Sequence, residues 1–181
     1  MKRFMSVLLA AILTLSAMSA LADVTFKTDY YTLTMPDEWV VDTDDLEADS
    51  LDGMDALGYL YAPGEMGLAV SAYLMRFEAE DGVSLWNAEE AEIQEYADAV
   101  VEDYSDDQAV LLDIVKANGV PFVLIRGTDM SGDYLYADTL TDSYAIEFIA
   151  YYTDVDGKPY PLTDEAIEQF KNILASFVPA A

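Results

Sequence analysis

The chain has 181 residues, with 35 Asp and Glu against 8 Lys and Arg, and it contains neither Cys nor His. Its formal net charge of −27 argues against nucleic acid or anionic lipid as a partner, because phosphate binding depends on Lys and Arg. The lack of His and Cys excludes Ser-His-Asp and Cys-His catalysis and metal sites with those ligands, and no cofactor is expected. Thirteen Tyr, seven Phe and two Trp nevertheless indicate a folded chain, since disordered chains are poor in aromatic residues.

Residues 1–22 have the pattern of a secretory signal peptide. Lys2 and Arg3 form a positive start, an apolar run covers residues 4–15, and Ala20 and Ala22 are the small residues that a signal peptidase reads. A retained membrane anchor is the alternative, but the run is shorter than the about 20 residues that span a bilayer. We therefore expect cleavage after about Ala22 and export, to the periplasm or the medium, of one domain covering residues 23–181. Its charge favours a monomer without membrane attachment.

Four strands are predicted in the first half of this domain. Residues 30–35 are rich in Tyr and Thr and stop at Pro36, and residues 39–41 resume the strand pattern after a turn. Residues 59–61 and 68–75 predict two more strands around the Pro63-Gly64 turn. The acidic stretch 42–58 shows no regular alternation, so we expect a loop there, with space for a short helical turn.

The second half predicts two helices and a four-strand meander. Apolar residues recur every three or four positions from Asn87 to Tyr104, and Asn87 with Glu90 could form a capping box. Strands at 110–115, 121–125, 134–140 and 144–152 are joined by short turns, of which Asn118-Gly119 is the strongest hairpin signal, so neighbours must be antiparallel. A helix at about 164–177 has Thr163 as its expected N-cap. The order predicts an α+β fold: a mainly antiparallel sheet of about six to eight strands covered by two main helices.

Three segments resemble the Mog/PsbP-like superfamily of small exported domains. Residues 31–39 follow its opening pattern of an aromatic, an alternating strand, Pro, a short turn and Trp, and a helix comes after the first strands. The hairpin at 115–119 and the closing residues 173–177 also match that pattern. The resemblance implies a Mog/PsbP-like sandwich and a role in protein binding or assembly rather than catalysis. Some relatives hold metal ions with His, which this chain lacks, so no metal residue is implied.

The acidic stretch is the first candidate site. A flexible loop of carboxylates suits calcium, which takes six to eight oxygen ligands. The spacing fails the EF-hand pattern, since the sixth and twelfth residues counted from Asp44 are Asp49 and Asp55 instead of Gly and Glu. A solvated loop is the alternative, and residues 154–157 are read as a turn rather than as part of a calcium loop. The weak candidates for metal ligands are Asp42, Asp44, Asp45 and Asp49.

Tyrosines form the second candidate site. Tyr134 and Tyr136 share one strand face, as do Tyr59 and Tyr61, because alternate residues of a strand point to the same side. Tyr is enriched in binding surfaces, so these four residues are a candidate surface; the alternative is that inner tyrosines pack beneath the helices.

The expected function is that of an exported, non-enzymatic binding or accessory protein that contacts another protein or a cell-envelope component. Two alternative functions are also compatible with the sequence. One is weak calcium binding by the acidic stretch 42–55. The other is a hydrolase built on two carboxylates, which glycoside hydrolysis would require roughly 5–10 Å apart.

Overall fold

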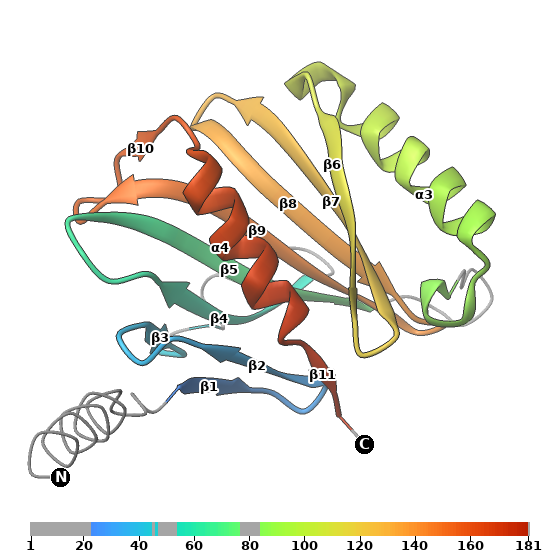
Figure 1. The fold of residues 1–181 in the computed structure, drawn as a ribbon, viewed down its shortest axis with the longest axis horizontal. Coiled ribbons are helices and arrows are strands. Elements are labelled where there is room, and N and C mark those ends of the chain that lie inside the picture. The colour runs from blue at the N-terminus through green and yellow to red at the C-terminus, as the bar shows by residue number, and fades with distance from the viewer. Residues whose placement is uncertain (1–22, 45, 47–53, 77–83, 181) are drawn as a thin grey trace, which may run out of the picture.

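A computed structural model describes residues 23–44, 46, 54–76 and 84–180, and these form an α+β protein with a large, mainly antiparallel sheet (Figure 1). Within the described residues the sheet has eight strands, all paired antiparallel. Its order is β3 (Val40–Asp42), β4 (Met54–Tyr61), β5 (Met66–Arg76), β9 (Tyr144–Asp154), β8 (Gly132–Leu140), β7 (Val120–Asp129) and β6 (Val110–Ala117), with β10 (Pro159–Tyr160) paired to β9. A small sheet joins β2 (Tyr31–Met35) to β1 (Val24–Lys27) and β11 (Val178–Pro179). The predicted α+β class with a mainly antiparallel sheet of six to eight strands is confirmed.

The meander and its hairpin follow the prediction closely. Strands β6 to β9 are neighbours in chain order, and Ala117 pairs with Val120 across the two-residue turn. Asn118 and Gly119 have φ values of 51° and 88°, the left-handed pair that this tight hairpin turn requires.

The strand prediction is wrong at two places in the first half. Residues 54–58 belong to β4 and not to a loop, because they pair with β5 through an irregularity between Ala56 and Gly58. Strand β1 was not predicted; it pairs with β2 and buries Phe26. In both segments the hydrogen bonds come from a partner strand. The local pattern of apolar and polar residues therefore does not predict these strands.

The two main helices among the described residues are α3 (Glu90–Asp103) and α4 (Asp164–Ala175). Helix α4 starts as predicted, with the Thr163 side chain accepting a hydrogen bond from the Ala166 amide. Helix α3 starts later than predicted, and its capping box is formed by Glu89 and Glu92. Asn87 instead ends the short 3₁₀ helix η1 (Leu85–Asn87). Buried Leu85 holds that turn in place, so Asn87 stays in η1 and the N-cap of α3 is Glu89.

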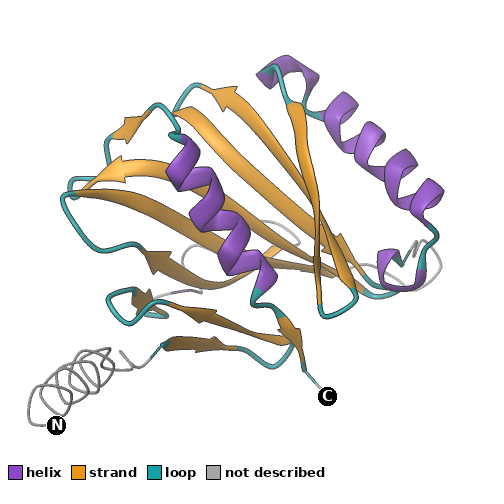
Figure 2. Ribbon diagram, viewed as in Figure 1, coloured by secondary structure: helices purple, strands orange, loops and turns teal. Residues whose placement is uncertain are grey.

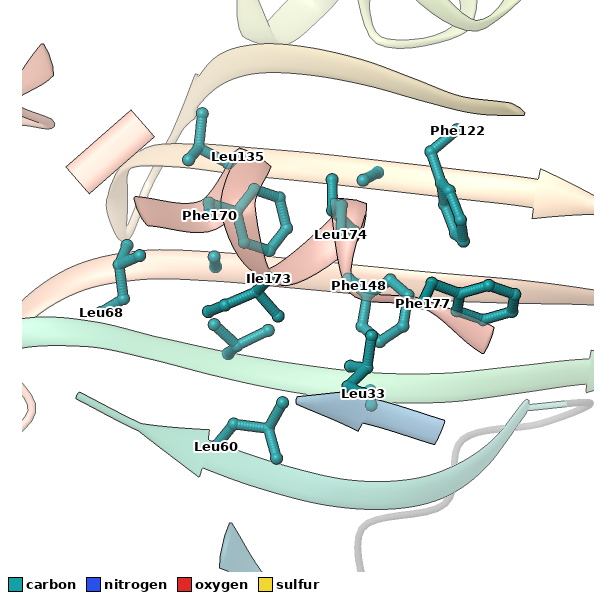
Figure 3. Close-up of a cluster of buried hydrophobic side chains, with 14 of the residues drawn as sticks. Leu33, Leu60, Leu68, Phe122, Leu135, Phe148, Phe170, Ile173, Leu174 and Phe177 are labelled. Atoms are coloured by element: carbon teal, nitrogen blue, oxygen red, sulfur yellow. The ribbon is translucent and has the colours of Figure 1, made fainter. Parts of the chain in front are cut away.

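Helix α4 covers one face of the large sheet and closes the main core (Figure 2). Phe170, Ile173 and Leu174 point from α4 toward the sheet residues Leu68, Leu135 and Phe148 (Figure 3). Phe177, just beyond the helix, packs with its ring centroid 4.9 Å from that of Phe122.

Helix α3 covers only part of the opposite face. It packs on β6 and β7, where Ala97 and Val100 join Val123, Ile125 and Tyr136 in a second core. On β4, on β5 and at the end of β9 that carries Tyr151, residues of the same face such as Ser71 are only half-buried. This difference leaves an open half of the sheet face beside a covered half. Among the described residues, no helix is both long and apolar enough to cross a bilayer.

Candidate functional site

A groove of about 600 Å³ lies on the open half of the sheet face, at one end of the strands. Tyr59 and Tyr61 of β4 and Tyr151 of β9 line it, together with small residues of β5 between them. These positions are neighbours by register, since Tyr59 pairs with Ser71 and Tyr61 with Ala69, and Ala69 pairs in turn with Tyr151. Side chains of three adjacent strands therefore present aromatic rings around a floor of Ala and Ser.

Turns form the rim of the groove. The β4–β5 turn contributes Gly64, the β7–β8 turn contributes Ser131, and the β9–β10 turn contributes Val155 and Gly157. The β4–β5 and β9–β10 turns lie at the same end of the sheet, at the left of Figure 1. Gly157 has a φ of 77°, which a side chain would strain, so the turn after β9 keeps a defined shape.

Exposed apolar side chains gather at this end of the molecule. Val155 is 76% exposed and Tyr61 40%, while Met130, next to Ser131 in its turn, is fully exposed. Val40, 57% exposed, pairs with Tyr61 across β3 and β4. These four are the majority of the seven large apolar side chains that are exposed in the described part of the chain. Large exposed apolar patches on a monomer mark interaction sites, so the groove and its rim are the leading candidate site.

Two ordered carboxylates stand at the rim. Asp129 accepts hydrogen bonds from the Tyr151 hydroxyl at 2.8 Å and from two backbone amides of its own turn. Asp154 accepts from the amides of Asp156 and Lys158 and from the Tyr160 hydroxyl. The hydrogen bond from the Lys158 amide is the main reason why the pKa of Asp154 lies below its usual value. Through these hydrogen bonds both carboxylates stabilise the conformation of the turns that form the rim.

The structure divides the four predicted tyrosines into two pairs. Tyr59 and Tyr61 line the groove, as a binding surface requires. Tyr134 and Tyr136 are only 4% and 6% exposed beneath α3, so that part of the predicted surface is wrong and the packing alternative holds for them. Tyr104, immediately after α3, packs on Tyr136 with a centroid distance of 5.0 Å.

Tyr151 is the groove residue that the sequence analysis missed. It pairs with Tyr134 on β8, so it lies on the same sheet face as Tyr134 and Tyr136. Tyr151 is only partly buried, because it lies at the edge of the area that α3 covers. The alternation within β9 predicts which sheet face Tyr151 lies on. The sequence does not indicate which part of that face the helix leaves uncovered.

A second unexpected feature is a pair of buried acids. Asp138 of β8 and Glu147 of β9 are cross-strand partners and are 2% and 7% exposed. The Tyr96 hydroxyl of α3 donates to one oxygen of Asp138, and the other oxygen has no hydrogen-bond partner among the described residues. Burial, with the nearby Glu147 as a smaller cause, raises the pKa of Asp138 to about 7. Burial also raises the pKa of Glu147.

These acids do not make the groove a carboxylate-based catalytic site. Neither Asp138 nor Glu147 is among the residues that line it, and both lie on the part of the sheet face that α3 covers. The sequence does contain a signal for them, since an acid interrupts the apolar residues of two central strands.

The predicted acidic loop is only partly described. Asp42 accepts a hydrogen bond from the Asp44 amide, and Asp55 forms an ion pair with Arg76 at 3.2 Å. Asp45 and Asp49 lie outside the described residues. Within the described ranges no group of three or more acidic side chains could hold a metal ion.

Comparison with known proteins leaves the family open. No protein-family model matches the chain, and no curated protein matches it. A crystal structure from Bacteroides thetaiotaomicron is similar to 87% of this chain and 48% of its own, with 14% sequence identity and a TM-score of 0.46. The chain therefore covers about half the length of that protein.

Proposed function

We propose that this is an exported, non-enzymatic binding or accessory protein that docks a partner protein of the cell envelope in the tyrosine-lined groove. The observation that carries the proposal is that exposed Tyr61 and Val155 line the groove, while exposed Val40 pairs with Tyr61 and exposed Met130 precedes the lining residue Ser131. Aromatic residues and Met are enriched in protein interfaces, where a few central side chains supply most of the binding free energy. A ring of Tyr with exposed Met and Val matches that composition.

Export is part of the proposal. The basic start, apolar run and small residues of positions 1–22 support a cleaved leader. We expect N-terminal sequencing of the protein recovered from the exported fraction to begin near Asp23. A product that begins at Met1 in the cytosolic fraction would contradict it.

We also propose that the fold is the Mog/PsbP-like sandwich. Trp39 after the Pro36 turn is buried, the Asn118-Gly119 hairpin is formed, and a C-terminal helix covers the sheet. These features support the resemblance, and they are consistent with the binding role that it implies.

The docking proposal is tested by capture of a partner from the envelope fraction with two matched double variants. Met130→Ser with Val155→Ser removes apolar contacts at the groove without changing charge. Val110→Ser with Val178→Ser likewise replaces two exposed apolar side chains by Ser, at positions outside the groove that are 52% and 49% exposed. We expect the first variant to lower affinity for a captured partner by about tenfold or more, because interface hot spots cost over about 1 kcal/mol each.

The control variant is expected to retain the wild-type affinity. Thermal unfolding of both variants excludes loss of fold as the cause. Equal capture by the groove variant and the wild type would overturn the proposal.

A further inference from the structure

The negative charge around the groove indicates which kind of peptide segment would bind there. Among the residues that line it there is an acid, Asp154, and no Lys or Arg. The turns on its two sides each add an exposed acid, Glu65 beside Gly64 and Asp156 beside Val155. None of these three carboxylates takes part in an ion pair within the described structure. The groove is therefore flanked by negative charge on opposite sides.

One basic side chain, Lys158, is close enough to Asp154 for its charge to be a minor cause of the lowered pKa of that carboxyl. The ammonium group of Lys158 lies over the Tyr160 ring, 5.2 Å from its centroid. Asp154 is ionised at neutral pH, as an ordinary Asp is, and the backbone hydrogen bonds that it accepts lower its pKa further. The net charge of the whole chain, −27, adds a long-range field of the same sign, which speeds the approach of a cation and slows that of an anion.

The aromatic walls favour the same ligand. Lys and Arg side chains pack their apolar stems along rings and place their charge over the ring face, a contact worth about 0.5–2 kcal/mol. Tyr59, Tyr61 and Tyr151 supply such faces on adjacent strands, with carboxylates at the ends of the same strands. Exposed Val155 and Met130 beside them supply contacts for apolar neighbours in the ligand.

Resting on the proposed function, we infer that the groove takes a peptide segment in which Lys or Arg side chains alternate with apolar ones. The basic side chains lie against the tyrosine rings and near Glu65, Asp154 and Asp156, while the apolar side chains contact the rim. A neutral or acidic segment of the same shape loses both the cation–ring contacts and the attraction of the turns.

The test uses the protein purified from the exported fraction and three labelled nonapeptides: one alternating Arg with Val, one with Gln in place of Arg and one with Glu. Fluorescence anisotropy measures each affinity. We expect the Arg peptide to bind about tenfold or more tightly than the Gln peptide, and the Glu peptide to bind most weakly. Raising NaCl from about 50 to 300 mM should weaken the Arg peptide most, because screening acts on exposed charges.

A matched pair of variants separates the groove from the overall charge. Glu65→Gln with Asp156→Asn removes two acids at the groove, and Glu95→Gln with Asp103→Asn removes two exposed acids on α3. Only the first variant should weaken the Arg peptide, by about threefold or more at low salt, because two nearby attractions are lost. Equal affinity for the three peptides, or equal loss in the two variants, would overturn the inference. Neither result would affect the docking proposal, which the apolar variants test separately.

Discussion

The protein is expected to be more stable to denaturant at pH 5 than at pH 8, because Asp138 holds a proton in the folded state. Its pKa is about 7 when folded, against 3.8 for an unperturbed Asp. The stability that this proton provides is fully present below the unfolded pKa and is lost as the pH rises through the folded pKa. The free energy of unfolding should therefore fall between about pH 4 and pH 7, by on the order of 4 kcal/mol in total.

The hydrogen bond from Tyr96 lowers the pKa of Asp138 and offsets part of this effect, but no cation faces the carboxyl. The titratable groups that face it are Tyr96 from α3, Tyr104 just after α3, Tyr136 from β8 and Glu147 from β9. None of them is a cation. The raised pKa of Glu147 acts in the same direction as that of Asp138.

Asp138→Asn tests this prediction directly. The amide oxygen of Asn can still accept from Tyr96, so the variant should be more stable than the wild type at pH 8 and should lose most of the slope between pH 5 and pH 8. Asp98→Asn, on the exposed surface of α3, removes an acid without this burial and should keep the wild-type slope. Urea unfolding followed by tryptophan fluorescence at each pH gives the comparison. Parallel pH profiles for the two variants would show that the buried pair is not the cause.

Phe177→Ala is expected to produce the largest loss of stability from a single core residue, about 3–5 kcal/mol. Phe177 is fully buried and joins three parts of the fold: its ring stacks on Tyr31 of β2 at 5.1 Å, and meets Phe122 of β7 and Trp86 of η1 edge-on. The Asn118 side chain donates to the Phe177 carbonyl, and Ala retains that bond. The loss of stability therefore measures the missing contacts of the Phe177 ring and the cavity that its removal leaves.

Denaturant unfolding measures this effect, with Val178→Ala as the neighbouring control. Val178 is 49% exposed, and its truncation should change stability by less than about 0.5 kcal/mol. If Phe177→Ala does not fold, Phe177→Leu keeps most of the volume and is expected to lose about 1–2 kcal/mol. A loss below about 1 kcal/mol for the Ala variant would contradict the packing described.

The parts of the fold predicted correctly are those whose signals lie within a few residues of each other. Thr163 caps α4 because its hydroxyl reaches an amide three residues ahead. Asn118 and Gly119 turn the β6–β7 hairpin because both tolerate positive φ. The error at Asn87 has the same origin, since Glu89 offered an equally local cap and only the docking of η1 on the sheet decided between them.

The candidate site needed information that local patterns lack. Tyr59, Tyr61, Tyr134 and Tyr136 have the same sequence signature, alternate tyrosines on a strand, yet two line a groove and two are buried. The difference is the position of α3. Its core includes Tyr134 and Tyr136 of β8, while the same face stays open on β4, on β5 and at the Tyr151 end of β9.

The sequence by itself determined the fold class, the meander, the start of the last helix and the negative charge, because caps, turns and alternation act between near neighbours in the chain. Only the tertiary structure decided which tyrosines meet solvent, that Asp138 faces Glu147, and that residues 54–58 form a strand. The physical reason is that burial and strand pairing depend on contacts between segments far apart in the chain. The free energy of these contacts cannot be derived from the sequence of one segment alone.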